Sequence, residues 1–358
     1  MEKFNLEKTL LKCKKSEEIS EEEMVFLLGL KDKENRKKLY KAAREVRNES
    51  FGNKIFTYGF VYFSTYCKNN CTFCNYRKSN DLSERYRKTV EEILATANKL
   101  KQEGVNLIDL TMGEDPVYYK DNQQKLIDLV KLVKEETNMP VMVSPGVIPN
   151  EAIDKLADMG AEWYACYQET HNVEKYNKMR LEQDYNVRMN AKEYAKKSGM
   201  LIEEGLLVGG MDISLEDIAH SFTEMKRIEA DQVRVMTFVP QEGTPLQNEK
   251  ASDNVLELNT IAVMRLLFHD QLIPASLDVE GLKGLEARLN AGASVVTSII
   301  PPHDGFRGVS QSTLDVDSAH RTVSGIQPVI KKCGLSLATV EEYKNWIHKR
   351  LYNMKEVI

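Results

Sequence analysis

The 358-residue sequence has no apolar run long enough to span a bilayer, and its first residues, MEKFNLEKTLLKCKKSEE, lack the apolar core of a signal peptide. These two absences predict a cytoplasmic protein without a membrane partner. Positive charge is not in excess either, since 49 Lys and Arg against 54 Asp and Glu leave a net charge of −5. Electrostatics therefore gives no reason to expect nucleic acid as a partner.

Cysteine is scarce and unevenly placed. Six cysteines in 358 residues do not make a disulfide framework, and a cytoplasmic compartment keeps thiols reduced. Three of them nevertheless share the stretch YCKNNCTFCNYR, as Cys67, Cys71 and Cys74. A structural zinc site or an ordinary iron–sulfur cluster needs a fourth ligand, and the next Cys or His along the chain is Cys166. The missing ligand favours a catalytic cluster with one open position over zinc or a chance grouping.

The order of predicted elements points to one large barrel. Residues 1–50 form charged, leucine-punctuated helices, and from residue 55 strands alternate with helices. The predicted strands are 55–63, 107–112, 140–143, 162–168, 201–208, 232–238, 272–277 and 293–299. The predicted helices that follow them are 89–103, 121–136, 150–159, 186–198, 215–229, 254–269, 281–291 and 318–332. No G-x-G-x-x-G opens the first of these helices, which weighs against an open dinucleotide-binding sheet.

Eight such units over about 250 residues predict a closed (β/α)₈ TIM-type barrel. We expect three parts: an N-terminal helical extension (1–50), the barrel (51–335) and a C-terminal helix (336–358) packed outside it. Active sites of such barrels lie in the loops after the strands. The cysteine stretch directly follows the first predicted strand, so position and composition agree.

The spacing C-x₃-C-x₂-C, with Phe73 before the last cysteine, resembles the radical S-adenosylmethionine (SAM) enzymes. The resemblance implies that Cys67, Cys71 and Cys74 hold one [4Fe–4S] cluster, whose fourth iron binds SAM. It further implies an electron donor, such as flavodoxin or ferredoxin, and cleavage of SAM to a 5′-deoxyadenosyl radical.

Further motifs in the same order are similar to the biotin synthase branch of that family and its hydrogenase-maturase relatives. They are MGEDP (112–116), YQETHN (167–172) and FVPQEGTPL (238–246), and the likeness covers about residues 50–330. Each motif alone would pass for an ordinary turn or a surface ion pair, but in this order they support one another. The SAM contacts that the resemblance implies are Tyr76, Gly113, Glu114, Asp115, Glu169 and Arg188.

Strand periodicity gives the predicted substrate pocket. Alternate residues of a barrel strand face inward, which predicts an interior Arg234 on the sixth strand, Ser276 and Asp278 on the seventh, and Asp109 and Thr111 on the second. One guanidinium and two carboxylates suit a substrate with one carboxylate and two amines. The alternative is that Arg234 and Asp278 only pair with each other.

The same reasoning bears on the reaction. Cys166 is the only other cysteine on a predicted barrel strand, and its phase places it toward the helices, which disfavours a second interior cluster and sulfur insertion. Within the branch, the motifs resemble members that isomerise L-lysine to 3-methylornithine for pyrrolysine biosynthesis, by radical fragmentation and recombination. This likeness implies that Arg234 holds the carboxylate while Ser276, Asp278 and Asp109 hold amines. Two alternatives stay open: a hydrogenase-maturase-like enzyme acting on another small amino acid, and a non-catalytic metal-binding protein.

Overall fold

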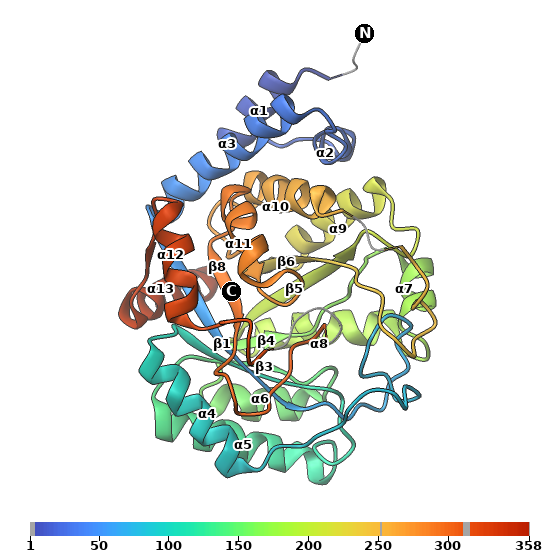
Figure 1. Cartoon of the computed structure of the whole chain (residues 1–358), viewed down its shortest axis with the longest axis vertical. Coiled ribbons are helices and arrows are strands. Elements are labelled where there is room, and N and C mark those ends of the chain that lie inside the picture. The colour runs from blue at the N-terminus through green and yellow to red at the C-terminus, as the bar shows by residue number, and fades with distance from the viewer. Residues whose placement is uncertain (1–3, 251–252, 311–315, 358) are drawn as a thin grey trace.

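A computed structural model describes residues 4–250, 253–310 and 316–357 (Figure 1). Parallel strands in the order β6-β5-β4-β3-β2-β1-β8-β7 form its core. The strands are β1 (Lys54–Ser64), β2 (Leu107–Met112), β3 (Val141–Ser144), β4 (Trp163–Ala165), β5 (Leu201–Val208), β6 (Gln232–Thr237), β7 (Pro274–Ser276) and β8 (Val295–Ile299). Just before β7, Leu272 exchanges backbone hydrogen bonds of 3.0 Å with Asp231 and Val233 beside β6, so the ring is nearly closed. The predicted (β/α)₈ barrel is confirmed.

The helices between the strands surround the barrel because each has an apolar stripe that it buries toward the sheet. In the described residues they are α1 (Leu6–Lys14), α2 (Glu21–Leu28), α3 (Lys33–Phe51), α4 (Val90–Glu103), α5 (Gln124–Thr137), α6 (Asn150–Asp158), α7 (Val173–Met179), α8 (Tyr185–Lys197), α9 (Leu215–Arg227), α10 (Val255–Leu267), α11 (Gly281–Asn290), α12 (Val323–Lys332) and α13 (Val340–Val357), with the 3-10 turn η1 (Asp121–Gln123). Of these, α7 was not predicted. No helix in the described ranges is long and apolar enough to cross a membrane.

The first three helices gather at one end of the molecule, beside α10 (Figure 1). Tyr40 on α3 donates a 2.8 Å hydrogen bond to Asn259 of α10, and Arg47 donates one of 2.7 Å to the Leu289 carbonyl of α11. They therefore pack on the outer helices of the barrel, and α3 ends beside the start of β1, where Phe51 contacts Phe56. The division of the chain at residues 50 and 335 stays a prediction.

The C-terminal helix closes the amino-terminal end of the barrel. Its Tyr343 is fully buried, and the Tyr343 hydroxyl lies 2.7 Å from that of Tyr58 on β1. Trp346 stacks on Trp163 of β4, with ring centroids 5.9 Å apart and planes 2° apart. The short strand β9 (Ser336–Leu337) pairs with β1 and leads the chain into this helix. The helix packs on the barrel across its amino-terminal end, where the aromatic side chains of α13 cover the barrel floor.

Candidate active site

The cysteine stretch forms a loop after β1, and its three cysteines are free thiols. Cys71 is buried, while Cys67 and Cys74 are partly buried. Gly113, at the end of β2, lies so close to the loop that a Cβ there would stand 2.2 Å from the Tyr66 carbonyl oxygen. The glycine of the MGEDP motif is therefore required by close packing against the cysteine loop.

The surroundings of the thiols fit metal ligation. Burial raises the pKa of Cys74 to about 12 and also raises that of Cys67, so these thiols stay protonated unless a cationic centre takes them as ligands. Cys71 Sγ accepts hydrogen bonds from Gln183 (3.1 Å) and Arg180 (3.6 Å), donors that suit a thiolate. Among the described residues no group of His, Cys, Asp and Glu is arranged to hold a metal ion. The assignment to an iron–sulfur cluster rests on the loop, these donors and the comparisons below.

Charged residues predicted to contact SAM meet beside this loop. Glu114 pairs with Arg188 (3.3 Å) and with Lys68 (3.1 Å), and Glu169 pairs with Arg180 (2.8 Å). Burial tends to raise the pKa of Glu114, but the charges of Arg188 and Lys68 outweigh it and lower that pKa. The carboxylates and guanidinium groups can recognise the amino and carboxylate groups of an amino acid moiety.

Two other predicted SAM contacts have roles in the loop itself. Asp115 is fully buried and accepts two hydrogen bonds from Arg87 (2.6 and 2.9 Å) and one from Ser64 (2.6 Å). The Tyr76 hydroxyl donates to the Gly308 carbonyl at 3.1 Å, which links the cysteine loop to the segment after β8. Both residues therefore hold the segments around the site in position, and their contact with SAM stays a prediction.

A cavity at the carboxyl end of the strands joins the two halves of the predicted site. Its lining includes Cys74 and Glu169 on the cofactor side and Asp109, Arg234 and Asp278 on the substrate side. The other lining residues that bear on the argument are Phe60, Thr111, Tyr167, Thr297, Ser298 and Ser310. Cys166 is buried and does not belong to this lining. The cavity is therefore one continuous space from the cysteine loop into the barrel.

Arg234 does not pair with Asp278, so that alternative was wrong. Its Nε donates to Glu203 on β5 at 2.7 Å and its Nη1 to Thr297 at 3.2 Å. Asp278 is held instead by Arg321, with an ion pair of 2.7 Å, and by Ser298 at 3.1 Å.

Glu203 and Arg321 are functional neighbours that the sequence analysis missed. Strand periodicity could have identified Glu203, because it has the phase of an interior residue on β5. Arg321 was expected within the helix 318–332, but α12 begins at Val323. Arg321 therefore lies in an irregular segment, whose side-chain directions no sequence periodicity predicts.

The remaining predicted substrate contacts sit nearby. Asp109 is fully buried and accepts a 2.9 Å hydrogen bond from Thr111. Burial and the nearby Glu203 carboxylate raise the pKa of Asp109 to about 7, despite the opposing effect of Arg234. Ser276 lies 3.4 Å from Ser298, hydroxyl to hydroxyl, but does not itself line the cavity. The substrate side of the cavity thus carries the Arg234 guanidinium and the carboxyl groups of Asp109 and Asp278, and their contact with substrate stays a prediction.

A (β/α)₈ barrel whose cysteine loop supplies only three ligands to a cluster is characteristic of radical SAM enzymes. Residues 61–225 match the radical SAM superfamily model. The chain is 44% identical over 328 residues to the 3-methylornithine synthase of Methanosarcina barkeri, covering 91% of this chain and 93% of that protein. The crystal structure of methylornithine synthase (PylB) has a TM-score of 0.90 at 42% identity, covering 94% of this chain and 99% of that one. This chain belongs to the 3-methylornithine synthase family.

A more distant relative shows how far the likeness extends. The [FeFe] hydrogenase maturase subunit HydE of Thermotoga maritima is 32% identical over 281 residues, covering 78% of this chain and 80% of that protein. Family membership brings with it a [4Fe–4S] cluster and SAM as cofactors, so the alternative of a non-catalytic metal-binding protein is set aside.

Proposed function

We propose that this enzyme isomerises L-lysine to 3-methylornithine for pyrrolysine biosynthesis. The observation that carries the proposal is the single cavity that reaches from Cys74 and Glu169 to Arg234, Asp109 and Asp278. When bound, the cluster and SAM supply a radical that removes a hydrogen atom from the substrate side chain. Every group needed to orient a diamino acid against that radical lines the same space.

Arg234 is the proposed anchor for the substrate carboxylate. Glu203 and Thr297 take two of its five N–H donors, and these bonds fix the plane of the guanidinium group. The planar group then offers remaining donors to a carboxylate, in the fork geometry that favours two parallel hydrogen bonds. Glu203 thereby orients Arg234 before the substrate arrives.

Asp278 and Asp109 are the proposed partners of the two amines. Asp278 is fixed by Arg321 and Ser298, so its carboxylate keeps one orientation. The pKa of Asp109 is raised to about 7 by burial, and a substrate ammonium beside it would favour its ionised form. Asp109 therefore carries a negative charge when a substrate ammonium is bound beside it, whereas burial favours its protonated, neutral form when the pocket is empty.

Confinement explains why the reaction needs this barrel. The proposed rearrangement breaks and remakes a carbon–carbon bond, so both fragments must stay together. The barrel floor is sealed by Tyr343 and Trp346 of α13, and Phe60 and Tyr167 line the wall. The aromatic side chains of the wall disfavour water, and the closed floor blocks escape through that end of the barrel.

The test is an anaerobic reaction of the iron- and sulfide-reconstituted, reduced protein with SAM and L-lysine, analysed by mass spectrometry. We expect 5′-deoxyadenosine and an isomer of lysine that elutes with authentic 3-methylornithine. Cys67→Ser should yield neither product. Abundant 5′-deoxyadenosine with no lysine isomer would refute lysine as substrate and favour a maturase-like enzyme acting on another small amino acid, given the likeness to HydE.

A further inference from the structure

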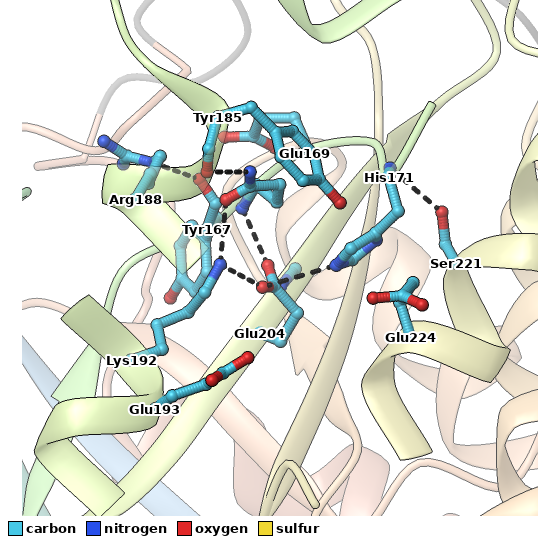
Figure 2. Close-up of polar contacts among 12 residues, drawn as sticks. Tyr167, Glu169, His171, Tyr185, Arg188, Lys192, Glu193, Glu204, Ser221 and Glu224 are labelled. Atoms are coloured by element: carbon cyan, nitrogen blue, oxygen red, sulfur yellow. Dashed lines mark hydrogen bonds and ion pairs between the residues drawn. The ribbon is translucent and has the colours of Figure 1, made fainter. Parts of the chain in front are cut away.

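A buried charged cluster lies behind Glu169, on the opposite side of the sheet from the cavity. Lys192 of α8 and Glu204 of β5 are both 0% exposed and form an ion pair. Figure 2 shows their side chains pointing toward each other, with the His171 ring beside Glu204. The Lys192 ammonium also donates to the Gln168 side-chain oxygen at 2.9 Å. None of these three side chains (Gln168, Lys192, Glu204) lines the cavity, so the mechanism above leaves them without a role.

The register of the sheet explains what Glu204 does. Ala165 pairs with Glu203, and the next paired residues are Glu169 and Leu206. Three residues (166–168) thus face two (204–205), which makes a β-bulge with backbone groups left over. The Glu204 carboxylate accepts the N–H of Gln168 at 2.7 Å and that of Gly205 at 2.8 Å. The Glu204 side chain therefore accepts two backbone N–H groups that the ladder of strand hydrogen bonds leaves unpaired at the bulge.

The bulge ends at the one residue of this segment with unusual backbone geometry. Glu169 has φ of +70°, the left-handed region that residues other than glycine rarely adopt and that is found where surrounding contacts enforce it. Beyond the bulge, Glu169 rejoins the ladder, accepting from Leu207 and donating to Gly205 at 3.0 Å. This turn places the Glu169 carboxylate in the cavity, beside Arg180.

Helix α8 secures the bulge from outside along one face. Arg188 donates to the Tyr167 carbonyl at 2.7 Å, and the Gln168 side-chain amide donates to the Tyr185 carbonyl at 3.1 Å (Figure 2). Lys192 lies one turn beyond Arg188 on the same face. The helix that supplies Arg188 to the SAM site therefore also fixes the segment that supplies Glu169.

The cost of this arrangement argues for a specific purpose. A fully buried ion pair contributes little to stability compared with apolar residues of the same size. Burial would raise the pKa of Glu204, but the Lys192 charge, the hydrogen bond from Lys192 and the nearby His171 ring outweigh it and lower that pKa to about 2. The carboxylate is thus available as a strong acceptor for the bulge N–H groups.

We propose that the Lys192–Glu204 pair is a positioning device that holds Glu169 in its left-handed conformation for SAM binding. The inference rests on the proposed function, because it takes Glu169 as a SAM contact. Without the ammonium, Glu204 turns away from the bulge to find another partner. Gln168 and Glu169 then relax toward an ordinary strand conformation, and the Glu169 carboxylate leaves its place in the cavity.

The test compares Lys192→Met and Lys192→Gln with a matched control, Lys196→Met. Lys196 lies one turn further along α8 and approaches Asp231 at 3.6 Å. Asp231 is itself a buried carboxylate that accepts a backbone N–H, that of Ile202, at the far end of β5. The control therefore removes a lysine beside a buried carboxylate on the same helix, away from Glu169, while Asp231 keeps its ion pair with Arg350 (2.9 Å).

The readouts are SAM affinity by calorimetry, iron content, and deuterium exchange of the backbone at residues 166–169. We expect both Lys192 variants to weaken SAM binding by about 10- to 100-fold, as residues that orient ligands from behind do. Exchange at 166–169 should rise, iron content should stay at the wild-type level, and Lys192→Arg should restore affinity. Lys196→Met should bind SAM as the wild type does. If Lys192→Met fails to fold, Lys192→Gln decides, since its amide keeps a hydrogen-bond donor.

Two outcomes would overturn the inference: Lys192 variants that bind SAM normally, or equal weakening in Lys196→Met, which would indicate general destabilisation. Failure of the proposed function looks different. Wild-type protein that neither binds nor cleaves SAM would refute the function itself, whereas wild-type turnover with unaffected Lys192 variants refutes only the positioning role.

Discussion

Replacing Arg234 with Met tests the substrate anchor, and the structure predicts two separable effects. The first is on stability, because Glu203 is fully buried and would lose its cationic partner. Breaking a buried pair costs about 3–5 kcal/mol. Glu203 keeps hydrogen bonds from Gln232 (2.5 Å) and Tyr167 (2.7 Å), so we expect the free energy of unfolding to fall by about 3 kcal/mol, measured by urea unfolding.

The second effect is on turnover. Losing a buried, charge-assisted contact to a carboxylate costs about 2–5 kcal/mol. At about 1.4 kcal/mol per factor of ten, kcat/KM for L-lysine should fall by roughly 30-fold to several thousand-fold. Iron content and SAM binding should not change, because Arg234 approaches the cavity from the strand β6 side, away from the cysteine loop.

The double variant Arg234→Met/Glu203→Gln separates these effects. Removing both charges leaves no unpaired carboxylate, so stability should return to within about 1 kcal/mol of the wild type. Turnover should stay as low as in the single variant. The assay is lysine isomer formation by mass spectrometry alongside urea unfolding. A double variant that regains turnover would show that Arg234 only neutralises Glu203, and the carboxylate anchor would be refuted.

Further variants test the loop, the pocket and the floor. Gly113→Ala should lower iron content, because its Cβ would stand 2.2 Å from the Tyr66 carbonyl; full iron loading would contradict this. Burial raises the pKa of Asp109 from its ordinary 3.8 to about 7, so between these values the folded state binds the extra proton. Wild-type stability should therefore fall from pH 4 to 7 by up to about 4 kcal/mol relative to Asp109→Asn, measured by urea unfolding; parallel pH curves would refute the shift. Tyr58→Phe and Tyr343→Phe should each cost about 1–3 kcal/mol, and the double variant less than their sum; strict additivity would show that the two hydroxyls do not interact.

Long, regular segments of the fold could be predicted from the sequence. The bounds of β2 and β5 agree with the prediction because six and eight residues give a clear pattern. Strand β4 has only three residues where seven were predicted, since the bulge and the left-handed Glu169 interrupt it. Helix α7 was missed because seven residues are too few for periodicity. Its N-cap, Asn172, which accepts from Lys175 at 3.2 Å, was the available signal.

The position of α13 could not be predicted for a different reason. Its aromatic residues lie about 180 to 290 positions from their partners on β4 and β1, and no local pattern encodes such a contact. The site shows the same division. Cysteine spacing and strand phase could predict that Cys74, Arg234 and Asp109 lie near one another, and strand phase could also have identified Glu203. Arg321, the partner of Asp278, depended on the three-dimensional arrangement.

Under the proposed function, those partners account for the preference for a diamino acid. Before substrate binds, Arg234 is balanced by Glu203 and Asp278 by Arg321, so the two pairs together carry no net charge. L-lysine brings one carboxylate and two ammonium groups, a net charge of +1. Asp109, with a pKa of about 7, supplies the one negative charge still needed when it loses its proton. With a neutral amino acid Asp109 would stay protonated and would form no ion pair, so substrates that lack a second amine should bind more weakly.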